Sequence, residues 1–271
     1  MQIGEKEAGE IISEIYDNSG YDFFQYSAPS LIRRFQRYID LKSISSLDEL
    51  FTLIGSEPEK MNEFIEEITV NVTEMFRDPY FFKIIRQALM TELYDKSPLK
   101  IWHAGCSTGE EVYSMAIILK EKNLLKNSII YATDINQSVL DIAKNGAYSL
   151  ENINQYEKNY TDSEASENLN AYYEVKNGEV VFNTELREKI IFSTHNLVSD
   201  SVFNKFDIIV CRNVLIYFNK ELQNTVLQTF YDSLNPDGFL ALGSKESLLF
   251  SPINQLMDEY NGQFKIWKKK G

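Results

Sequence analysis

The segment from Leu99 to Glu111 constrains the fold more than any other part of this 271-residue chain. It begins with an apolar run, passes through a turn of small residues that contains Gly105 and Gly109, and continues into a predicted helix at Glu110. Glycine permits tight backbone geometry and a close approach of the backbone to a ligand. The segment therefore predicts a strand–turn–helix unit that belongs to an α/β sheet.

The same alternation of strands and helices continues from about residue 98 to the end of the chain. Further strands are predicted at 128–132, 206–211, 238–242 and 263–267, and helices at 110–122, 137–144 and 220–234. The turn at 235–238 is expected to stop the last helix. Such alternation is typical of a parallel sheet with helices on both faces. The predicted fold class is α/β, with a doubly wound sheet.

One region interrupts this rhythm. Residues 151–171 are polar and rich in Asn, Glu and Ser, which predicts a loop. Two β-prone runs, 172–175 and 179–182, then flank Asn177-Gly178. An Asn-Gly pair between such runs is a strong hairpin signal. We therefore expect a small antiparallel β insert at about 170–193.

Residues 1–70 have a different pattern. Apolar residues at helical spacing predict helices at about 8–16, 27–41 and 58–68, and a further helix opens at the capping box Ser46–Glu49. We expect a small N-terminal helical domain over 1–70, a linker over 71–97 and an α/β domain over 98–271.

The acidic residues around the glycine turn indicate which ligand it binds. Glu110 and Glu111 follow Gly109 directly, and they would repel a pyrophosphate at the helix N-terminus. A ligand that carries an ammonium and a sulfonium would be attracted, which favours S-adenosylmethionine, with S-adenosylhomocysteine as its product, over NAD or ATP. Asp134 ends the next strand and can accept hydrogen bonds from ribose hydroxyls. The alternatives are that the glutamates only complement the helix dipole and that Asp134 is a solvated strand end.

Composition argues against several kinds of partner, site and membrane segment. A net charge of −13 argues against nucleic acid as a partner. Two cysteines, Cys106 and Cys211, and two distant histidines argue against a disulfide framework and against a metal site. The chain has no signal-like start and no run near the ~18 apolar residues of a membrane span. We expect a cytoplasmic protein without membrane insertion, and two buried thiols rather than a redox pair.

Four motifs resemble those of the chemotaxis-receptor methyltransferases, the CheR family. They are Asn71–Asp78, Trp102 with Ser107–Ser114, His195–Leu197 and Cys211–Phe218, in the family's order and spacing. The resemblance implies a class I (Rossmann-like) methyltransferase fold with a small N-terminal helical domain and a small antiparallel β insert. It also implies methyl esterification of glutamate side chains on chemotaxis receptors, with S-adenosylmethionine as the donor.

The resemblance carries roles over to individual residues. Segment 71–97 would cover the cofactor, and the acids would hold its amino-acid end and ribose. The implied cofactor-binding residues are Asn71, Thr73, Arg77, Gly105, Gly109, Glu110, Asp134, Asn196, Leu197, Arg212 and Asn213, and the implied catalytic residues are Arg77, Asn213 and Tyr217. The alternatives are a surface ion pair with Asp78 or a nearby acid for Arg77 and core packing for Tyr217.

A basic cluster stands out in the acidic N-terminal region, which holds six basic and fourteen acidic residues. On a helical wheel, Arg33, Arg34 and Arg37 lie away from the face that carries Leu31 and Phe35. We expect this helix to present three arginines outward, to the glutamate-bearing cytoplasmic helices of chemotaxis receptors. A plain solvated face is the alternative. We expect the protein to act as a monomer.

Two departures from the family pattern bear on function. Gly243-Ser244-Lys245-Glu246 stands where the family usually has Gly-His-Ser-Glu, and the Asn177-Gly178 turn is short, which argues against tethering of a receptor tail at the β insert. The absence of a histidine base fits a carboxylate acceptor, which is already an anion at pH 7. Two rival hypotheses are a same-fold methyltransferase for another protein or small molecule, and a non-catalytic cofactor-binding scaffold.

Overall fold

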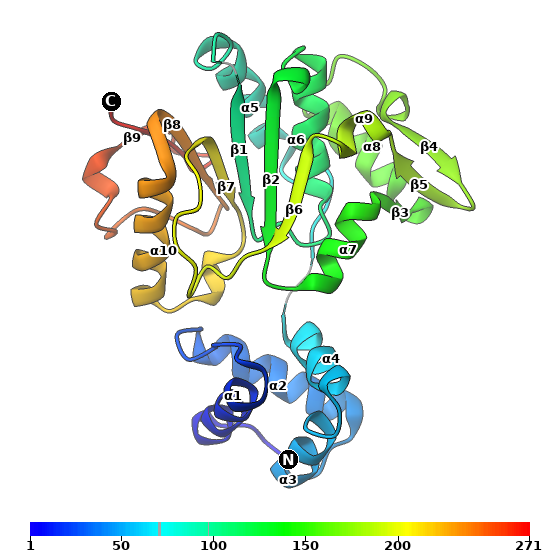
Figure 1. Cartoon of the computed structure of the whole chain (residues 1–271), viewed down its shortest axis with the longest axis vertical. Coiled ribbons are helices and arrows are strands. Elements are labelled where there is room, and N and C mark those ends of the chain that lie inside the picture. Colours follow the sequence, from blue (N-terminus) through cyan, green and yellow to red (C-terminus); the bar gives the residue numbers. More distant parts are fainter. Residues whose placement is uncertain (70–71, 97) are drawn as a thin grey trace. The chain divides into compact units, whose positions relative to one another are not determined.

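The computed structural model describes residues 1–69, 72–96 and 98–271, which fall into two compact units. One unit consists of Met1–Val70 with Leu215–Thr225, and the other of Asn71–Val214 with Val226–Gly271. Figure 1 labels the elements. We describe each unit by itself.

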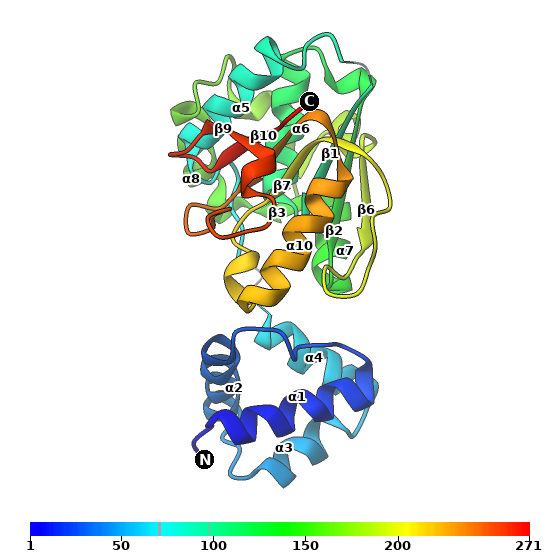
Figure 2. The same cartoon turned by 90° about the vertical axis from the view of Figure 1, so that its left-hand side faces the viewer.

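The first unit is helical, as the sequence predicted. Its helices are α1 Glu5–Ser19, α2 Ala28–Lys42, α3 Leu47–Ile54 and α4 Pro58–Ile68, drawn in blue to cyan in Figure 2. Gly20 ends α1 in the left-handed conformation and donates its N–H to the Tyr16 carbonyl. At α3 the Ser46 hydroxyl accepts the Glu49 N–H, whereas the Glu49 carboxylate accepts the N–H of Ser45 rather than that of Ser46.

Aromatic and aliphatic side chains from all four helices form the core of this unit. The Phe35 and Phe64 rings stack with centroids 5.9 Å apart, and Tyr38 meets Phe64 edge to face at 4.6 Å. Offset and edge-to-face pairs of this kind add to the stabilisation that burial provides. The apolar stripe of α2 therefore faces inward, as its periodicity predicted.

The second unit is built on a seven-stranded sheet, which confirms the α/β class. Its strand order is β6-β2-β1-β7-β8-β10-β9. The strands are β1 Leu99–Ala104, β2 Ser128–Asp134, β6 Ile190–Thr194, β7 Phe206–Cys211, β8 Leu234–Leu242, β9 Met257–Asn261 and β10 Ile266–Lys269. The first five strands in spatial order run parallel, and β10 pairs antiparallel with both β8 and β9. The order reverses between β1 and β7, and ligands bind at such a point in open α/β sheets.

Helices cover both faces of this sheet (Figure 1). They are α5 Pro79–Thr91, α6 Glu110–Glu121, α7 Gln137–Asn145, α8 Ile153–Asp162, α9 Thr184–Arg187 and the part of α10 Lys220–Ser233 from Val226 on. Short 3₁₀ turns of this unit are η1 Leu125–Asn127, η2 Leu150–Asn152, η3 Leu169–Tyr172 and η5 Asn254–Leu256, whereas η4 Leu215–Tyr217 belongs to the first unit. On one face α5, α6 and α8 contribute to the largest core cluster. On the other, buried Trp102 meets Phe206 and, from α10, Phe230, each at 5.3 Å.

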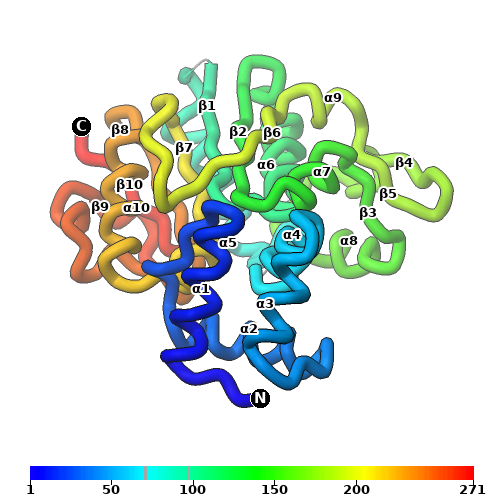
Figure 3. Tube along the Cα trace, turned by 60° about the horizontal axis from the view of Figure 1, so that its bottom comes forward, coloured from blue at the N-terminus to red at the C-terminus, as the bar shows by residue number. Residues whose placement is uncertain are grey.

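The β insert is a separate three-stranded antiparallel sheet, labelled beside α8 in Figure 3. Its strands are β3 Ala147–Ser149, β4 Tyr173–Lys176 and β5 Glu179–Phe182, in the order β3-β5-β4. Its hairpin was expected, but its third strand lies before the expected range of about 170–193, and Ile190–Thr194 at the end of that range forms β6 of the main sheet. The prediction of a loop over 151–171 was wrong, because α8 occupies 153–162. Ile153, Tyr156 and Tyr160 recur at helical spacing and are buried, and these two tyrosines supply most of the apolar face of a helix that is otherwise polar.

Two smaller differences concern the segment 71–97 and the end of the sheet. Helix α5 lies within the segment expected to be a linker. Strand β8 begins at Leu234, so the expected turn at 235–238 lies inside the strand, where the register with β7 shifts. Among the described residues, none of the helices is both long and apolar enough to cross a bilayer.

Candidate cofactor site

The turn after β1 requires glycine at its first position. Gly105 has φ +74°, and its N–H and that of Cys106 donate to the Thr133 carbonyl at 2.8 and 2.9 Å. A Cβ on Gly105 would lie 2.4 Å from a methyl group of Val214. The backbone of the turn therefore lies tightly between the end of β2 and the residues that follow β7, at the point where the strand order reverses.

The second glycine of the turn places a buried acid at the start of α6. Gly109 caps the helix at φ +91°, and a Cβ there would lie 2.8 Å from that of Ala143. Glu110 follows it and is only 6% exposed. Its carboxylate accepts the Thr108 hydroxyl at 2.6 Å and the Tyr156 hydroxyl at 3.4 Å. Burial raises the pKa of Glu110. This acid has no cationic partner among the described residues, so its carboxylate is available to a cationic ligand.

Asp134 joins the end of β2 to the turn. One of its carboxylate oxygens accepts the Ser107 N–H at 2.8 Å and the other accepts the Asn136 N–H at 3.1 Å. Burial raises the pKa of Asp134 as well. The Ser107 hydroxyl beside it is 8% exposed and makes no hydrogen bond within the part of the chain that the structure describes. A buried acid, Glu110, a half-buried acid, Asp134, and the unpaired Ser107 hydroxyl form a donor and acceptor set that suits a ribose and an ammonium.

Glu111 does not share the environment of Glu110. Its carboxylate pairs with the Arg212 guanidinium at 2.7 Å and with His103 Nδ1 at 3.2 Å. Burial opposes ionisation of Glu111, but Arg212 and His103 outweigh it and the pKa of the carboxyl falls to about 2. Glu111 is therefore an internal ion-pair partner rather than a ligand contact.

Arg212 is the centre of that network. Its side chain is 3% exposed, pairs with Asp78 in addition to Glu111, and donates to the Arg77 carbonyl at 3.3 Å. The guanidinium also lies 4.2 Å from the centroid of the Phe81 ring. Arg212 thus connects the end of β7 to the start of α6 and to the segment before α5. Its predicted contact with the cofactor stays a prediction.

The segment before α5 carries three predicted site residues. Asn71 lies outside the described residues. Thr73 and Arg77 are half-buried, and the Arg77 guanidinium donates to the Val72 carbonyl at 3.5 Å. Arg212, and not Arg77, makes an ion pair with Asp78, which was the alternative role expected for Arg77.

Asn213 follows β7 in the left-handed conformation, with φ +64°. The Glu246 carboxylate accepts its N–H at 3.1 Å and that of Val214 at 2.9 Å, and also binds the N–H of Gly243. Glu246 is 5% exposed and ties the ends of β7 and β8 together. Sequence reasoning missed this residue, because the altered segment 243–246 was considered only for its absent histidine.

Asn196 and Leu197 follow β6, next to β2. The Asn196 carboxamide accepts the Val198 N–H at 2.9 Å, and the backbone N–H of Asn196 donates to Asp200 at 2.8 Å. The preceding His195 donates its N–H to the Asp134 carbonyl at 3.0 Å. Asn196 and Leu197 therefore directly follow a residue, His195, that is hydrogen-bonded to the end of β2. Both of their side chains are half-buried.

The two cysteines near the site are free and buried. Burial raises the pKa of both the Cys106 and Cys211 thiols well above their ordinary value. A raised pKa keeps a thiol protonated and slow to react.

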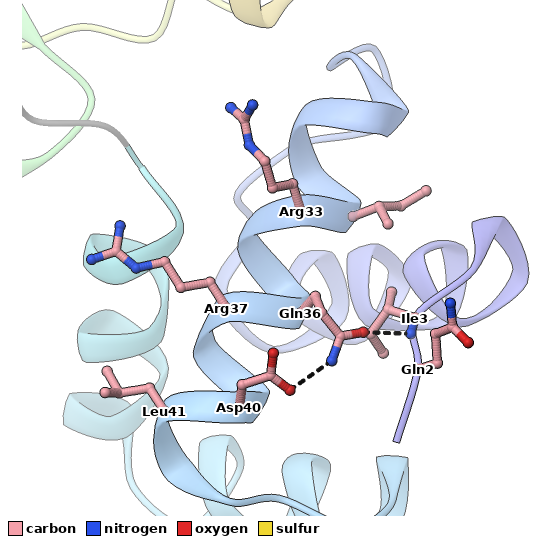
Figure 4. A pocket seen from close by; sticks show the side chains of 8 residues that line it. Gln2, Ile3, Arg33, Gln36, Arg37, Asp40 and Leu41 are labelled. Atoms are coloured by element: carbon pink, nitrogen blue, oxygen red, sulfur yellow. Dashed lines mark hydrogen bonds between the residues drawn. The ribbon is translucent and has the colours of Figure 1, made fainter.

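The remaining predicted residues belong to the helical unit. Arg33 and Arg37 are exposed and line a shallow groove of about 640 Å³ with residues of the N-terminal segment and α2 (Figure 4). The prediction that Arg34 points outward was wrong: it is 9% exposed. Its guanidinium lies 4.3 Å from the centroid of the Tyr217 ring, in the 215–225 segment of the same unit. The helical wheel placed Arg34 beside Arg33 and Arg37, but it could not show that the 215–225 segment packs against Arg34.

Comparison with known proteins identifies the family. The model described as the CheR methyltransferase SAM-binding domain matches residues 71–262, and the CheR all-alpha domain matches residues 6–69. This chain belongs to the CheR methyltransferase family. The matched domain is described as binding S-adenosylmethionine, and the family is one of methyltransferases.

Relatives of this CheR family member match over nearly its whole length. Cher3 of Pseudomonas putida is 41% identical over 96% of this chain and 95% of its own. A chemotaxis protein methyltransferase of Listeria innocua is 32% identical, covering 91% and 92% of the two chains. Chemotaxis protein methyltransferase 2 of Pseudomonas aeruginosa is 31% identical, covering 89% and 86%.

Proposed function

We propose that this CheR-family protein transfers the methyl group of S-adenosylmethionine to glutamate side chains of chemotaxis receptors and so forms methyl esters. The observation that carries the proposal is that both domains of the family match in succession, with the acid-lined turn of Glu110 and Asp134 in place at the end of the sheet. Relatives named as chemotaxis protein methyltransferases support the choice of receptors as the target.

Residues around the turn are proposed to hold the cofactor. Glu110 would bind the ammonium of its amino-acid end, since this acid is buried and lies at the start of α6. Asp134 would accept from the ribose hydroxyls, using lone pairs that its bonds to Ser107 and Asn136 leave free. Asn196 and Leu197 would line the adenine pocket. When bound, the cofactor supplies a sulfonium methyl group that is open to nucleophilic attack.

The acceptor explains why a base is not required. A glutamate carboxylate has an ordinary pKa near 4.3 and is ionised at pH 7. The protein must then position this anion and exclude water around it. Positioning of this kind can supply roughly 7–11 kcal/mol of a reaction barrier. Arg77 is proposed to orient the carboxylate, because a guanidinium offers a paired set of donors. Asn213, which Glu246 holds at the end of β7, is proposed to complete the acceptor site.

Docking of the receptor is proposed to use the exposed arginines of α2. Arg33 and Arg37 project from one side of the helix in Figure 4. The target is a glutamate-bearing helix, so the two positive charges would steer it against the net negative charge of the chain.

The test uses tritiated S-adenosylmethionine and receptor-rich membranes, followed by mild alkali. Methyl esters release volatile tritiated methanol on this treatment, and the proposal predicts that nearly all of the protein-bound label is released. An Asp134→Ala variant is the control for cofactor-dependent labelling. Label that resists alkali, or labelling of a different protein with none on the receptors, would defeat the proposal.

A further inference from the structure

Arg34 is a buried arginine that has no carboxylate partner among the described residues. Its side chain lies on the inner side of α2, between exposed Arg33 and buried Phe35. One guanidinium nitrogen donates to the Ile68 carbonyl at 2.6 Å. The other two nitrogens are buried and make no hydrogen bond among the described residues. An arginine in this state is costly, since burying a charge without a counter-ion is unfavourable.

The main neighbour of the unbonded part of the guanidinium is an aromatic ring. The Arg34 Cζ atom lies 4.3 Å from the centroid of the Tyr217 ring. A guanidinium over a ring face gains cation–π energy, and more so where water is excluded. Burial lowers the pKa of Arg34, while Tyr217 acts in the opposite direction and favours the charged form. The aromatic contact therefore compensates for burial of the charge together with the hydrogen bond to the Ile68 carbonyl.

The backbone of Tyr217 is fixed by the same helical unit. Its carbonyl accepts the Ser27 N–H at 2.8 Å, and the Gln25 carbonyl accepts the Asn219 N–H at 2.8 Å. Tyr26 and Phe218 form an isolated antiparallel bridge, and their rings meet at 5.0 Å. These bonds hold the backbone of Tyr217, so mainly its side-chain torsions can still change. The planar guanidinium of Arg34, which lies over the ring, restricts those torsions.

We propose that Arg34 is a positioning residue that acts through Tyr217, and not part of the receptor-docking surface formed by Arg33 and Arg37. The inference rests on the proposed function and on the catalytic role that the family resemblance implies for Tyr217. Three neighbouring arginines of one helix then divide into two roles. The exposed pair determines how tightly the receptor binds, and the buried one determines how fast bound receptor is methylated.

The test is a double-mutant cycle on the full-length chain, with receptor-rich membranes as acceptor. Arg34→Met keeps the aliphatic volume but removes the charge, and Tyr217→Leu removes the ring. Each single variant is expected to lower kcat about tenfold, with the receptor KM and the S-adenosylmethionine Kd within about twofold of the parent. The double variant is expected to be no slower than the worse single variant, because both changes remove the same contact.

Matched controls come from the same helix. Arg33→Met and Arg37→Met make the same chemical change at exposed positions and are expected to raise the receptor KM while kcat is retained. If Arg34→Met fails to fold, as judged by circular dichroism, Arg34→Lys replaces it. Lysine keeps the charge but loses the planar face, so an intermediate kcat is expected.

Three results would overturn the inference: a rise of the receptor KM for Arg34→Met like that of its neighbours, additive losses of kcat in the double variant, or an unchanged kcat. A parent protein that labels no receptor would instead defeat the proposed function. In that case the same cycle applies to whatever acceptor the parent methylates, so the two failures can be told apart.

Discussion

Replacing Glu111 by glutamine tests the ion-pair network that supports the cofactor site. The substitution keeps the shape of the side chain and removes its charge. Arg212, whose side chain is 3% exposed, then keeps Asp78 as its only carboxylate partner among the described residues. The Asp78 side chain is 50% exposed, so it compensates the buried charge poorly.

The expected loss of stability follows from the pKa of Glu111. A fall from the ordinary value of 4.5 to about 2 corresponds to about 3 kcal/mol, at 1.36 kcal/mol for each pKa unit. Removing one partner of a buried ion pair costs about 3–5 kcal/mol in other proteins. We therefore expect Glu111→Gln to lower the free energy of unfolding by about 3 kcal/mol at pH 7.

Urea unfolding followed by tryptophan fluorescence measures this loss directly. Trp102 and Trp267 are the two tryptophans of the chain, and both are buried in the α/β unit. Because the pKa of Glu111 is lowered in the folded state, its contribution is complete above the unfolded pKa near 4.5 and is lost as the pH falls towards 2. The difference between parent and variant should shrink by about 1 kcal/mol between pH 6 and pH 3.5.

Glu185→Gln is the matched control. Glu185 pairs with Lys120 at 2.5 Å, but its side chain is 62% exposed, so its removal should cost less than about 1 kcal/mol. If Glu111→Gln behaves like Glu185→Gln, or if its effect grows at low pH, the network does not stabilise the site as argued.

Four further predictions follow from the same residues. Asp134→Ala should weaken S-adenosylmethionine binding by about 1–3 kcal/mol in calorimetry, through loss of ribose hydrogen bonds; an unchanged Kd would contradict the assignment. Burial raises the pKa of Glu110 and a bound cation favours its ionised form, so cofactor affinity should fall as the pH drops through that pKa, and Glu110→Gln should flatten the profile. Replacing both Arg33 and Arg37 by alanine should raise the receptor KM and make it less sensitive to salt; equal salt sensitivity would argue against docking there. Gly105→Ala should lower the free energy of unfolding by about 2 kcal/mol or more, since a Cβ at φ +74° would meet a valine methyl at 2.4 Å.

Most of the fold could be predicted because its signals are local. Strand–helix alternation and the glycine turn predicted the α/β sheet, apolar periodicity predicted α1, α2 and α4, and a capping-box pattern predicted α3. The Asn177-Gly178 hairpin gave the small sheet. Helix α8 was missed because the apolar face of a polar segment depends on Tyr156 and Tyr160, whose burial is decided by tertiary packing rather than by composition.

The site was less predictable, since side-chain partners far apart in sequence decide it. Adjacent Glu110 and Glu111 look equivalent in the sequence, yet one lacks a cationic partner among the described residues and the other pairs with Arg212, 101 positions later. Arg34 could not be separated from Arg33 without knowing that Tyr217 covers it. Glu246 belongs to no sequence pattern that predicts its role, because that role is to accept backbone N–H groups at the end of another strand.

The most direct test of the proposed activity is to identify the methylated side chain. After reaction with S-adenosylmethionine, receptor peptides would be sequenced by tandem mass spectrometry under acidic conditions that preserve esters. The account predicts methyl groups on glutamate carboxylates within helical receptor segments, and none with heat-inactivated protein. Methyl groups on a lysine, arginine or other nitrogen, with unmodified glutamates, would contradict it.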